Sequence, residues 1–445
     1  MKRFQSKYFA FIAAVLVTIQ ILAACAPATS TPVAPSAATQ PSTSITEIIP
    51  QTGATEEPTS EATAAPTEHA MGTEPVSGSG KGTDPLVFKQ AMRKLWEDHI
   101  QLTRVYLVSA IADLPDSDAA AEHLLKNQKD IGDAIKPFYG DEAGEQLTTL
   151  LKEHITIAVD LVNAAKASDT VRLEDAQTRW TENANQIGTF LSGANADHWP
   201  EDEMQAMMKT HLDLTLEEAT ARLNGDYAAD IAAYDKVHDA MLEMSDMLAD
   251  GIIMQFPDQF AEQTASQAEI DLTLAMDKLW EDHITWTRMY VISAAADLPD
   301  SDAVAERLLK NQEDIGNAIK PLYGDEAGEQ LTSLLKEHIT IAVDLVSAAK
   351  AGDNAKIEDA NARWTENANQ IGTFLSTANA ENWSEDEMQT MMKTHLDLTL
   401  EEATARLSGD WAGDIAAYDK VHDAILEMSG MLTRGIVAQF PDKFS

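Results

Sequence analysis

The sequence predicts an all-α protein made of two tandem six-helix antiparallel bundles that follow a disordered tether. After residue 85, apolar residues recur at spacings of three and four, and no alternating β run ends in a hairpin turn. The sequence also repeats itself: Trp96-Glu97-Asp98-His99 returns as Trp280-Glu281-Asp282-His283, an offset of 280 − 96 = 184 residues. A period this long lies outside the range of solenoid repeats, so each copy is expected to form its own bundle.

Caps and breakers define the helices of the first copy. Proline, glycine and Asp or Ser caps interrupt the helical pattern at regular intervals, and the turns between them are short, as in an up-and-down bundle. The six predicted helices run from 85 to 113, from 116 to 137, from 141 to about 167, from 169 through Leu191, from 200 to 224, and from 226 to 256. In the second copy Ser384 and Glu387 form a predicted capping box.

Composition and the repeat divide the chain into five parts. These are a signal segment (1–24), a lipidated cysteine with its tether (25–84), the first copy (85–260), a connector (261–267) and the second copy (268–445). The tether is rich in Ser, Thr, Pro and Ala and has almost no large apolar side chains, so it is expected to stay disordered.

The first residues predict export. Three cations precede an apolar run over 9–22, which is typical of a secretory signal. The run ends in Leu22-Ala23-Ala24-Cys25, which resembles a bacterial lipobox and implies that Cys25 is lipidated and anchors the protein outside the cytoplasm to the cell membrane. The alternative is a plain secretory signal in which Cys25 has no role. Because Cys25 is the only cysteine, no disulfide or thiolate metal site is expected.

The formal net charge of −41 excludes nucleic acid as a partner and disfavours flat docking on anionic lipid. The carboxylates fall mostly on the polar faces of the predicted helices, where they serve solubility. An acidic cation sponge is the alternative, and a cationic surface partner would also suit this charge.

Several strings resemble a family of exported, all-helical bacterial proteins whose activity is not assigned. They are Leu95 to His99, Leu125-Lys126-Asn127-Gln128, Ile135-Lys136-Pro137, Met208 to Leu214 and Gln255-Phe256-Pro257. Some members carry a glycosyltransferase label, but this chain has neither the strand pattern nor the acidic metal-binding loop of such enzymes. No catalytic motif is found, so the sequence favours a protein that is not an enzyme.

Four histidines occur at matching positions in the two copies. They are His99, His154, His211 and His238 in the first copy and His283, His338, His395 and His422 in the second. Each continues an apolar stripe of its helix, so each is expected to point inward. Counting about 1.5 Å per residue along the helices places His154, His211 and His238 at one level, with Asp235 one turn before His238.

The predicted centre therefore consists of His154, His211, His238 and Asp235 in the first copy and His338, His395, His422 and Asp419 in the second. The same count puts His99 and His283 about two turns away, at the periphery. Imidazoles suit a divalent transition metal such as zinc, copper or iron, and the centre could instead hold a small polar ligand. The protein would then scavenge, buffer or sense that ligand.

Two alternatives stay open. Each histidine could be an ordinary core residue whose ring nitrogens are satisfied by neighbours. The whole protein could also be a surface-displayed interaction or structural module without a ligand site.

Overall fold

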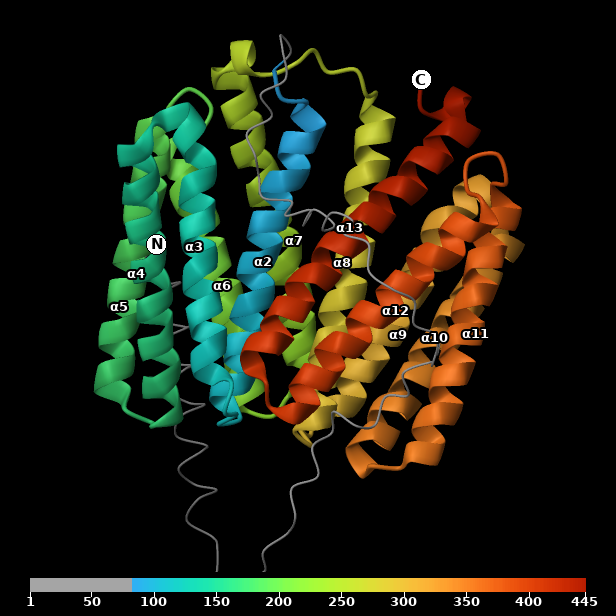
Figure 1. Cartoon of the computed structure of the whole chain (residues 1–445). Coiled ribbons are helices and arrows are strands. Elements are labelled where there is room, and N and C mark those ends of the chain that lie inside the picture. Colours follow the sequence, from blue (N-terminus) through green and yellow to red (C-terminus); the bar gives the residue numbers. More distant parts are fainter. Residues whose placement is uncertain (1–81) are drawn as a thin grey trace, which may run out of the picture.

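The computed structural model describes residues 82–445, and this part of the chain is all helical (Figure 1). The first copy contains α2 (Pro85–Ile111), α3 (Ser117–Tyr139), α4 (Asp141–Lys166), α5 (Thr170–Ala194), α6 (Glu201–Leu223) and α7 (Tyr227–Gln255). The second contains α8 (Gln267–Ala295), α9 (Ser301–Tyr323), α10 (Asp325–Ala351), α11 (Asn354–Ala378), α12 (Glu385–Ser408) and α13 (Trp411–Gln439). Short 3₁₀ turns, η3 (Pro257–Gln259) and η4 (Pro441–Lys443), end the copies. The predicted all-α fold is confirmed; the predictions for the signal segment, for Cys25 and for the tether up to residue 81 lie outside the described residues.

Side-chain caps explain most helix starts. Asp84 accepts a hydrogen bond from the backbone N–H of Leu86 at 2.8 Å at the start of α2, and Asp226 accepts one from Ala229 at 3.1 Å at the start of α7. Ser384 and Glu387 form the predicted capping box of α12. These bonds satisfy N–H groups that the first helical turn leaves without intrahelical partners.

Two local predictions were wrong. Asp116 does not cap α3: it has an αR backbone conformation, and its carboxylate accepts hydrogen bonds from the Ser109 hydroxyl and from Arg406 of the second copy. Pro137 does not end α3 either, since the helix continues to Tyr139 and stops at Gly140, whose φ is 85°. Left-handed backbone of this kind is the usual place for glycine at a helix end.

In each copy the six helices form a closed ring. Consecutive helices pack against each other, and the last helix returns to pack against the first, α7 on α2 and α13 on α8. One close contact between a glycine and a tryptophan occurs at the matching place in each ring of helices. Gly251 lies against the indole of Trp199 in the first copy, and Gly435 lies against that of Trp383 in the second. A Cβ atom at Gly251 would come within 2.0 Å of the Trp199 Nε1 atom, so a larger residue there would displace the indole or the helix.

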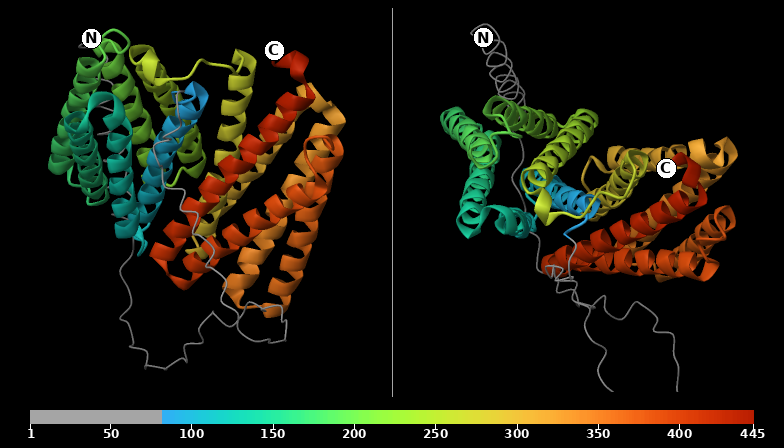
Figure 2. Two further views of the ribbon diagram at one scale, coloured as in Figure 1. Left: turned by 45° about the horizontal axis from the view of Figure 1, so that its top comes forward. Right: turned by 90° about the horizontal axis from the view of Figure 1, so that it is seen from above.

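The two rings pack side by side about an approximate two-fold axis (Figures 1 and 2). Helices α2 and α8 meet at the centre, and α7 contacts α9 while α13 contacts α3. Ion pairs cross this interface in reciprocal positions. Arg222 donates to Asp300 at 2.8 Å and Arg406 donates to Asp116 at 2.5 Å; 222 and 406, like 116 and 300, differ by 184 residues. Such an isologous contact is the arrangement of a symmetric dimer.

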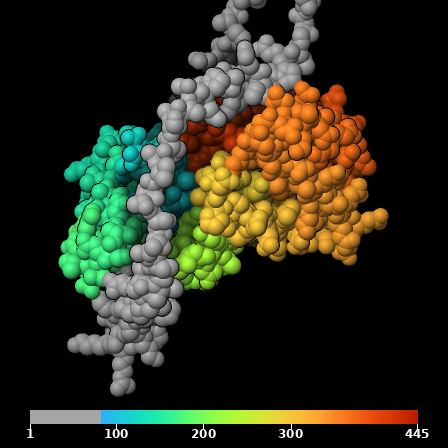
Figure 3. All heavy atoms as spheres, turned by 90° about the horizontal axis from the view of Figure 1, so that it is seen from below, coloured from blue at the N-terminus to red at the C-terminus, as the bar shows by residue number. Residues whose placement is uncertain are grey.

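A buried arginine ties each first helix into this interface. Arg104 of α2 donates to Glu218 at 2.7 Å and to Asp230 at 3.1 Å, and Asp230 also accepts from Arg222. The Arg288 guanidinium repeats the arrangement with Glu402 and Asp414 in the second copy. Each network thus runs from the buried arginine of one ring to a carboxylate of the other copy, Asp300 or Asp116. Viewed from below, the two copies form two lobes that meet at this interface (Figure 3).

Candidate functional site

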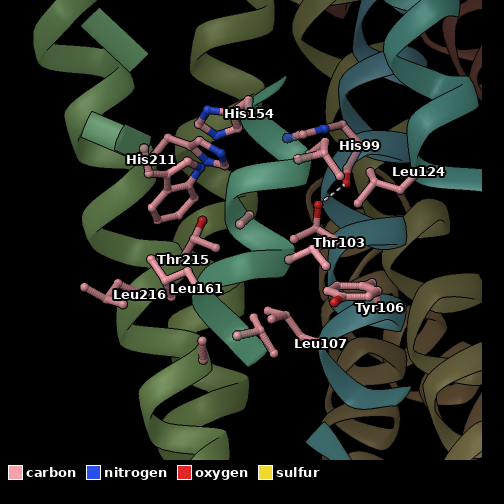
Figure 4. Close-up of a pocket in the computed structure, with 16 residues that line it drawn as sticks. His99, Thr103, Tyr106, Leu107, Leu124, His154, Leu161, His211, Thr215 and Leu216 are labelled. Carbon is pink, nitrogen blue, oxygen red and sulfur yellow. Dashed lines mark hydrogen bonds between the residues drawn. The ribbon is translucent and has the colours of Figure 1, made fainter. Parts of the chain in front are cut away.

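Three histidines meet inside the first ring: His99 from α2, His154 from α4 and His211 from α6 (Figure 4). The ring centroids of His99 and His211 are 5.7 Å apart, and those of His154 and His211 are 5.9 Å apart, so His211 lies between the other two. In the second ring His283 and His395 are 5.4 Å apart and His338 and His395 are 6.0 Å apart. All six side chains are buried.

The predicted grouping was therefore wrong in one histidine. His99 and His283, expected at the periphery, belong to the two clusters, while His238 and His422 lie at the interface between the copies. Asp235 pairs with Arg307 at 3.0 Å, and Asp419 faces His123 at 3.4 Å, so neither carboxylate reaches its predicted centre. The residue count failed in two ways: it misplaced the heights of His99 and His283, and it gave no information on the direction of each side chain. His238 lies on the face of α7 that turns toward α2 and α8.

His99, His154 and His211 line a cavity of about 30 Å³ in the first ring. The rest of the lining is mostly apolar, with the hydroxyls of Thr103, Tyr106 and Thr215 added (Figure 4). The Thr103 hydroxyl is already used, since it donates to the His99 carbonyl at 2.7 Å. A cavity of this size has room for one or two water molecules, or for a single ion with one water.

Asn183 fixes the protonation pattern of His154. The Asn183 side-chain NH₂ donates to the Leu150 carbonyl at 3.0 Å, so the Asn183 oxygen must be the atom that contacts the His154 Nδ1 atom at 2.8 Å. That oxygen can only accept, so Nδ1 carries the proton and Nε2 keeps a free lone pair. Nε2 is buried and has no hydrogen-bond partner in the described part of the chain. Asn367 and His338 repeat every one of these features in the second copy.

The imidazoles of His99 and His211 have fewer hydrogen bonds than that of His154. His211 Nδ1 and the Thr215 hydroxyl are also buried without a partner among the described residues. His99 Nδ1 lies 3.2 Å from the Gln128 side-chain nitrogen, which has shorter contacts with the Leu124 carbonyl and the Asn127 side-chain oxygen, at 2.8 and 2.9 Å. An amide nitrogen has only two hydrogens, so Gln128 does not fix the tautomer of His99.

Burial keeps these imidazoles neutral. Desolvation, followed by the nearby His154, lowers the pKa of His99 to about 3, and desolvation lowers the pKa of His154 to about 4. The pKa of His211 is lowered well below its ordinary value by burial and then by His99 and His154. Neutral imidazole is the form that binds metal ions.

The interface histidines have the opposite character. His238 contacts Glu97 of its own copy through Nε2, and its Nδ1 lies 3.2 Å from Asp282 of the other copy. His422 mirrors it between Glu281 at 2.9 Å and Asp98 at 3.0 Å. Although burial lowers the pKa of both rings, the paired carboxylates outweigh it and raise that of His238 to about 10 and that of His422 to about 9. Each of these two histidines therefore forms ion pairs that bridge the two copies.

The carboxylates of this interface were missed in the sequence, although a signal was present. Glu97, Asp98 and His99 are three consecutive polar residues on a helix, and the equivalent Glu281, Asp282 and His283 are all buried. Consecutive helical positions point in different directions, so a buried polar triplet indicates contacts on several sides. Here Glu97 reaches α7, Asp98 reaches α13, and His99 reaches α3 and α6.

Within residues 82–445 no three or more His, Cys, Asp or Glu side chains are already arranged around a point where a metal ion would fit. None of the helices in this range has an apolar stretch long enough to cross a membrane. No protein family, curated protein or solved structure matches the chain.

Proposed function

We propose that each ring binds one divalent transition metal ion through its three inward imidazoles, His99, His154 and His211 in the first copy and His283, His338 and His395 in the second. The observation that carries this proposal is the bond between Asn183 and His154. It places the proton on Nδ1 and leaves the Nε2 lone pair buried without a partner. In metal sites a carbonyl or carboxylate that accepts from the outer ring nitrogen orients the ligating histidine in this way.

The distances between the imidazole rings also support the proposal. Two imidazoles bound to one tetrahedral zinc ion at about 2.0–2.1 Å have ring centres roughly 5 Å apart. The neighbouring imidazoles here have centroids 5.4 to 6.0 Å apart, so each neighbouring pair must close by about 0.4 to 1 Å around an ion, and the two outer imidazoles must close further. Within residues 82–445 neither His99 nor His211 has a firm hydrogen bond to its imidazole, so hydrogen bonding does not fix their orientations. Three nitrogens leave a fourth position for water, which the Thr215 hydroxyl would contact.

Leaving these groups without a ligand is costly. A buried polar atom without a hydrogen bond destabilises a protein by about 1–3 kcal/mol. With only residues 82–445 considered, His154 Nε2, His211 Nδ1 and the Thr215 oxygen of the first cluster are such atoms. A bound ion and its water would satisfy all three.

The biological role follows from the predicted location. If Cys25 anchors the protein outside the cytoplasm, two metal centres on a long tether would scavenge or buffer a transition metal near the membrane surface. The absence of any thiol other than Cys25 leaves nitrogen and oxygen as the strongest ligands at such centres.

Metal binding can be measured directly. We expect the untagged protein to take up two equivalents of Co²⁺ or Zn²⁺ per chain, with a cobalt absorption spectrum typical of nitrogen ligands. His211→Gln with His395→Gln should abolish uptake. His198→Asn is the matched control, because the second copy has Asn382 at that position. No uptake by the unaltered protein, or uptake that survives the double change, would mean that these histidines are core residues only.

A further inference from the structure

A groove of about 420 Å³ lies between α12 and α13 of the second copy. His395, the central histidine of the second cluster, forms part of its wall. The His395 side chain is 9% exposed, against 3% for His283 and 2% for His338, so it is the most exposed member of that cluster. Because the groove reaches the second histidine cluster at His395, we call it the entrance to that cluster.

Sulfur ligands line this entrance beside the imidazole. Met391 lies one turn before His395 on α12, and Met428 and Met431 lie one turn apart on the facing helix α13. Met391 and Met431 are only partly buried, unlike the methionines of the core. Filling space in a core is the usual role of methionine, and all three side chains also pack in or against the second core, but their position at the groove leaves the thioethers available to a ligand.

Charge at the mouth favours a cation. Asp386, Glu387 and Glu427 line the groove, and Arg434 is the one cation among its lining residues. Arg434 is exposed and has no ion-pair partner within residues 82–445. The excess of carboxylates would attract a positive ion and repel an anion.

We infer that the groove between α12 and α13 binds a soft monovalent cation of the Cu⁺ class through the thioethers of Met391, Met428 and Met431, with His395 as its nitrogen ligand. Thioether and imidazole together suit Cu⁺ better than Zn²⁺ or Ca²⁺. This inference rests on the proposed function, because His395 is shared with the second metal centre. It adds the class of metal that the entrance selects.

The first copy has the same donors at the same spacing. Met207, Met244 and Met247 occupy the positions of Met391, Met428 and Met431, and His211 that of His395. Asp250 stands where the second copy has Arg434, and it pairs with Lys89 at 2.6 Å. The chain is therefore expected to take two equivalents of a soft cation.

Ag⁺ tests the inference, since it has the charge and softness of Cu⁺ and does not change oxidation state. Calorimetric titration of the full chain should show two Ag⁺ equivalents. Met391→Leu, Met428→Leu and Met431→Leu together should lose one equivalent or weaken it at least tenfold, while Co²⁺ uptake stays at two. Leucine replaces methionine at nearly constant volume, so the fold should persist. Arg434→Asp should tighten Ag⁺ binding.

The matched control changes three core methionines, Met92, Met276 and Met388, to leucine. This variant should keep both Ag⁺ equivalents. Unchanged Ag⁺ binding after the groove substitutions, or equal loss in the core control, would overturn the inference. The two proposals fail separately: no Co²⁺ uptake by the unaltered chain overturns the histidine centre, whereas normal Co²⁺ uptake with Ag⁺ binding independent of the groove methionines overturns only the soft-cation site.

Discussion

At the scale of single residues, Asn183 has the clearest role around the histidine cluster. It does not line the cavity itself, yet its oxygen sets the tautomer of His154, which does. We expect Asn183→Leu to lower the Co²⁺ affinity of the first centre by about 10- to 100-fold, the usual effect of losing such a partner. The second centre, served by Asn367, should keep its affinity and act as an internal reference.

The control for this change is Asn185→Leu, an exposed position on the same helix. It should leave both affinities unchanged. Equal weakening of the two centres by Asn183→Leu, or a similar loss in the control, would argue against an orienting role for Asn183.

His238 illustrates a different use of the same side chain. Its charged ring lies between Glu97 and Asp282, and all three groups are buried. His238→Leu would leave two buried carboxylates without their cation, which destabilises a protein by about 3–5 kcal/mol. Urea denaturation should show a decrease of this size in the free energy of unfolding for His238→Leu and almost none for His198→Asn. A decrease below about 1 kcal/mol for His238→Leu would contradict the bridging role of His238.

At the scale of helices, the contact between Gly251 of α7 and the Trp199 indole sets how closely two parts of the ring approach. Gly251→Ala places a methyl group 2.0 Å from Nε1, so the indole or the helix must move. Overpacking of this kind costs about 1–3 kcal/mol. Thermal denaturation should show a clear fall in Tm.

Gly193 on α5 is the matched helical glycine. A Cβ there meets nothing within 4 Å, and alanine is the better helix former, so Gly193→Ala should stabilise the protein by up to about 1 kcal/mol. Opposite signs for the two substitutions are expected. If both substitutions destabilise the protein, the expected gain in helix propensity from Gly193→Ala is wrong, and the result for Gly251→Ala cannot be assigned to the Trp199 contact.

The sequence was a good guide to the helices and a poor one to the orientation of their side chains. Periodicity and caps such as Asp226 and Ser384 predicted where each helix begins, because those signals are local. Asp116 has the sequence of a cap but bonds to Arg406, 290 residues away, and no local pattern carries that information. The exchange of His99 for His238 in the cluster has the same cause, since it depends on how α2, α7 and α8 face one another.

At the scale of the whole molecule, the two kinds of buried histidine predict a maximum of stability near pH 6.5 for the metal-free protein. The cluster histidines have folded pKa values below their ordinary value of 6.5, so the unfolded state binds more protons below that pH. Stability should fall as the pH decreases from 6.5, by about 1.4 kcal/mol per pH unit for each such histidine. The raised pKa values of Glu218 and Glu402, about 7 through burial, partly offset this fall.

On the alkaline side the interface controls stability. The folded pKa values of His238 and His422 are raised, so their contribution is complete below pH 6.5 and is lost as the pH rises through about 9 to 10. Urea midpoints measured between pH 4 and 10 should therefore decline on both sides of the maximum. His238→Gln with His422→Gln should flatten the alkaline decline and leave the acidic one. A midpoint that does not vary with pH would contradict both assignments.

The approximate two-fold interface between the copies affects how their sequences can diverge. In a dimer of identical chains, any substitution appears on both sides of the axis at once, so a charge near the axis faces its own image. Here Arg93 and Asp277 are equivalent positions (277 − 93 = 184), yet they carry opposite charges; Arg93 bonds to the Leu274 carbonyl at 3.1 Å and Gln90 bonds to Asp277 at 2.8 Å. Leu102 and Trp286 are also equivalent positions but differ in size, and the Trp286 ring contacts both Arg104 and Arg307. Joining the copies in one polypeptide thus releases each half from mirroring the other, so the two histidine clusters can diverge in sequence while the interface between the copies is kept.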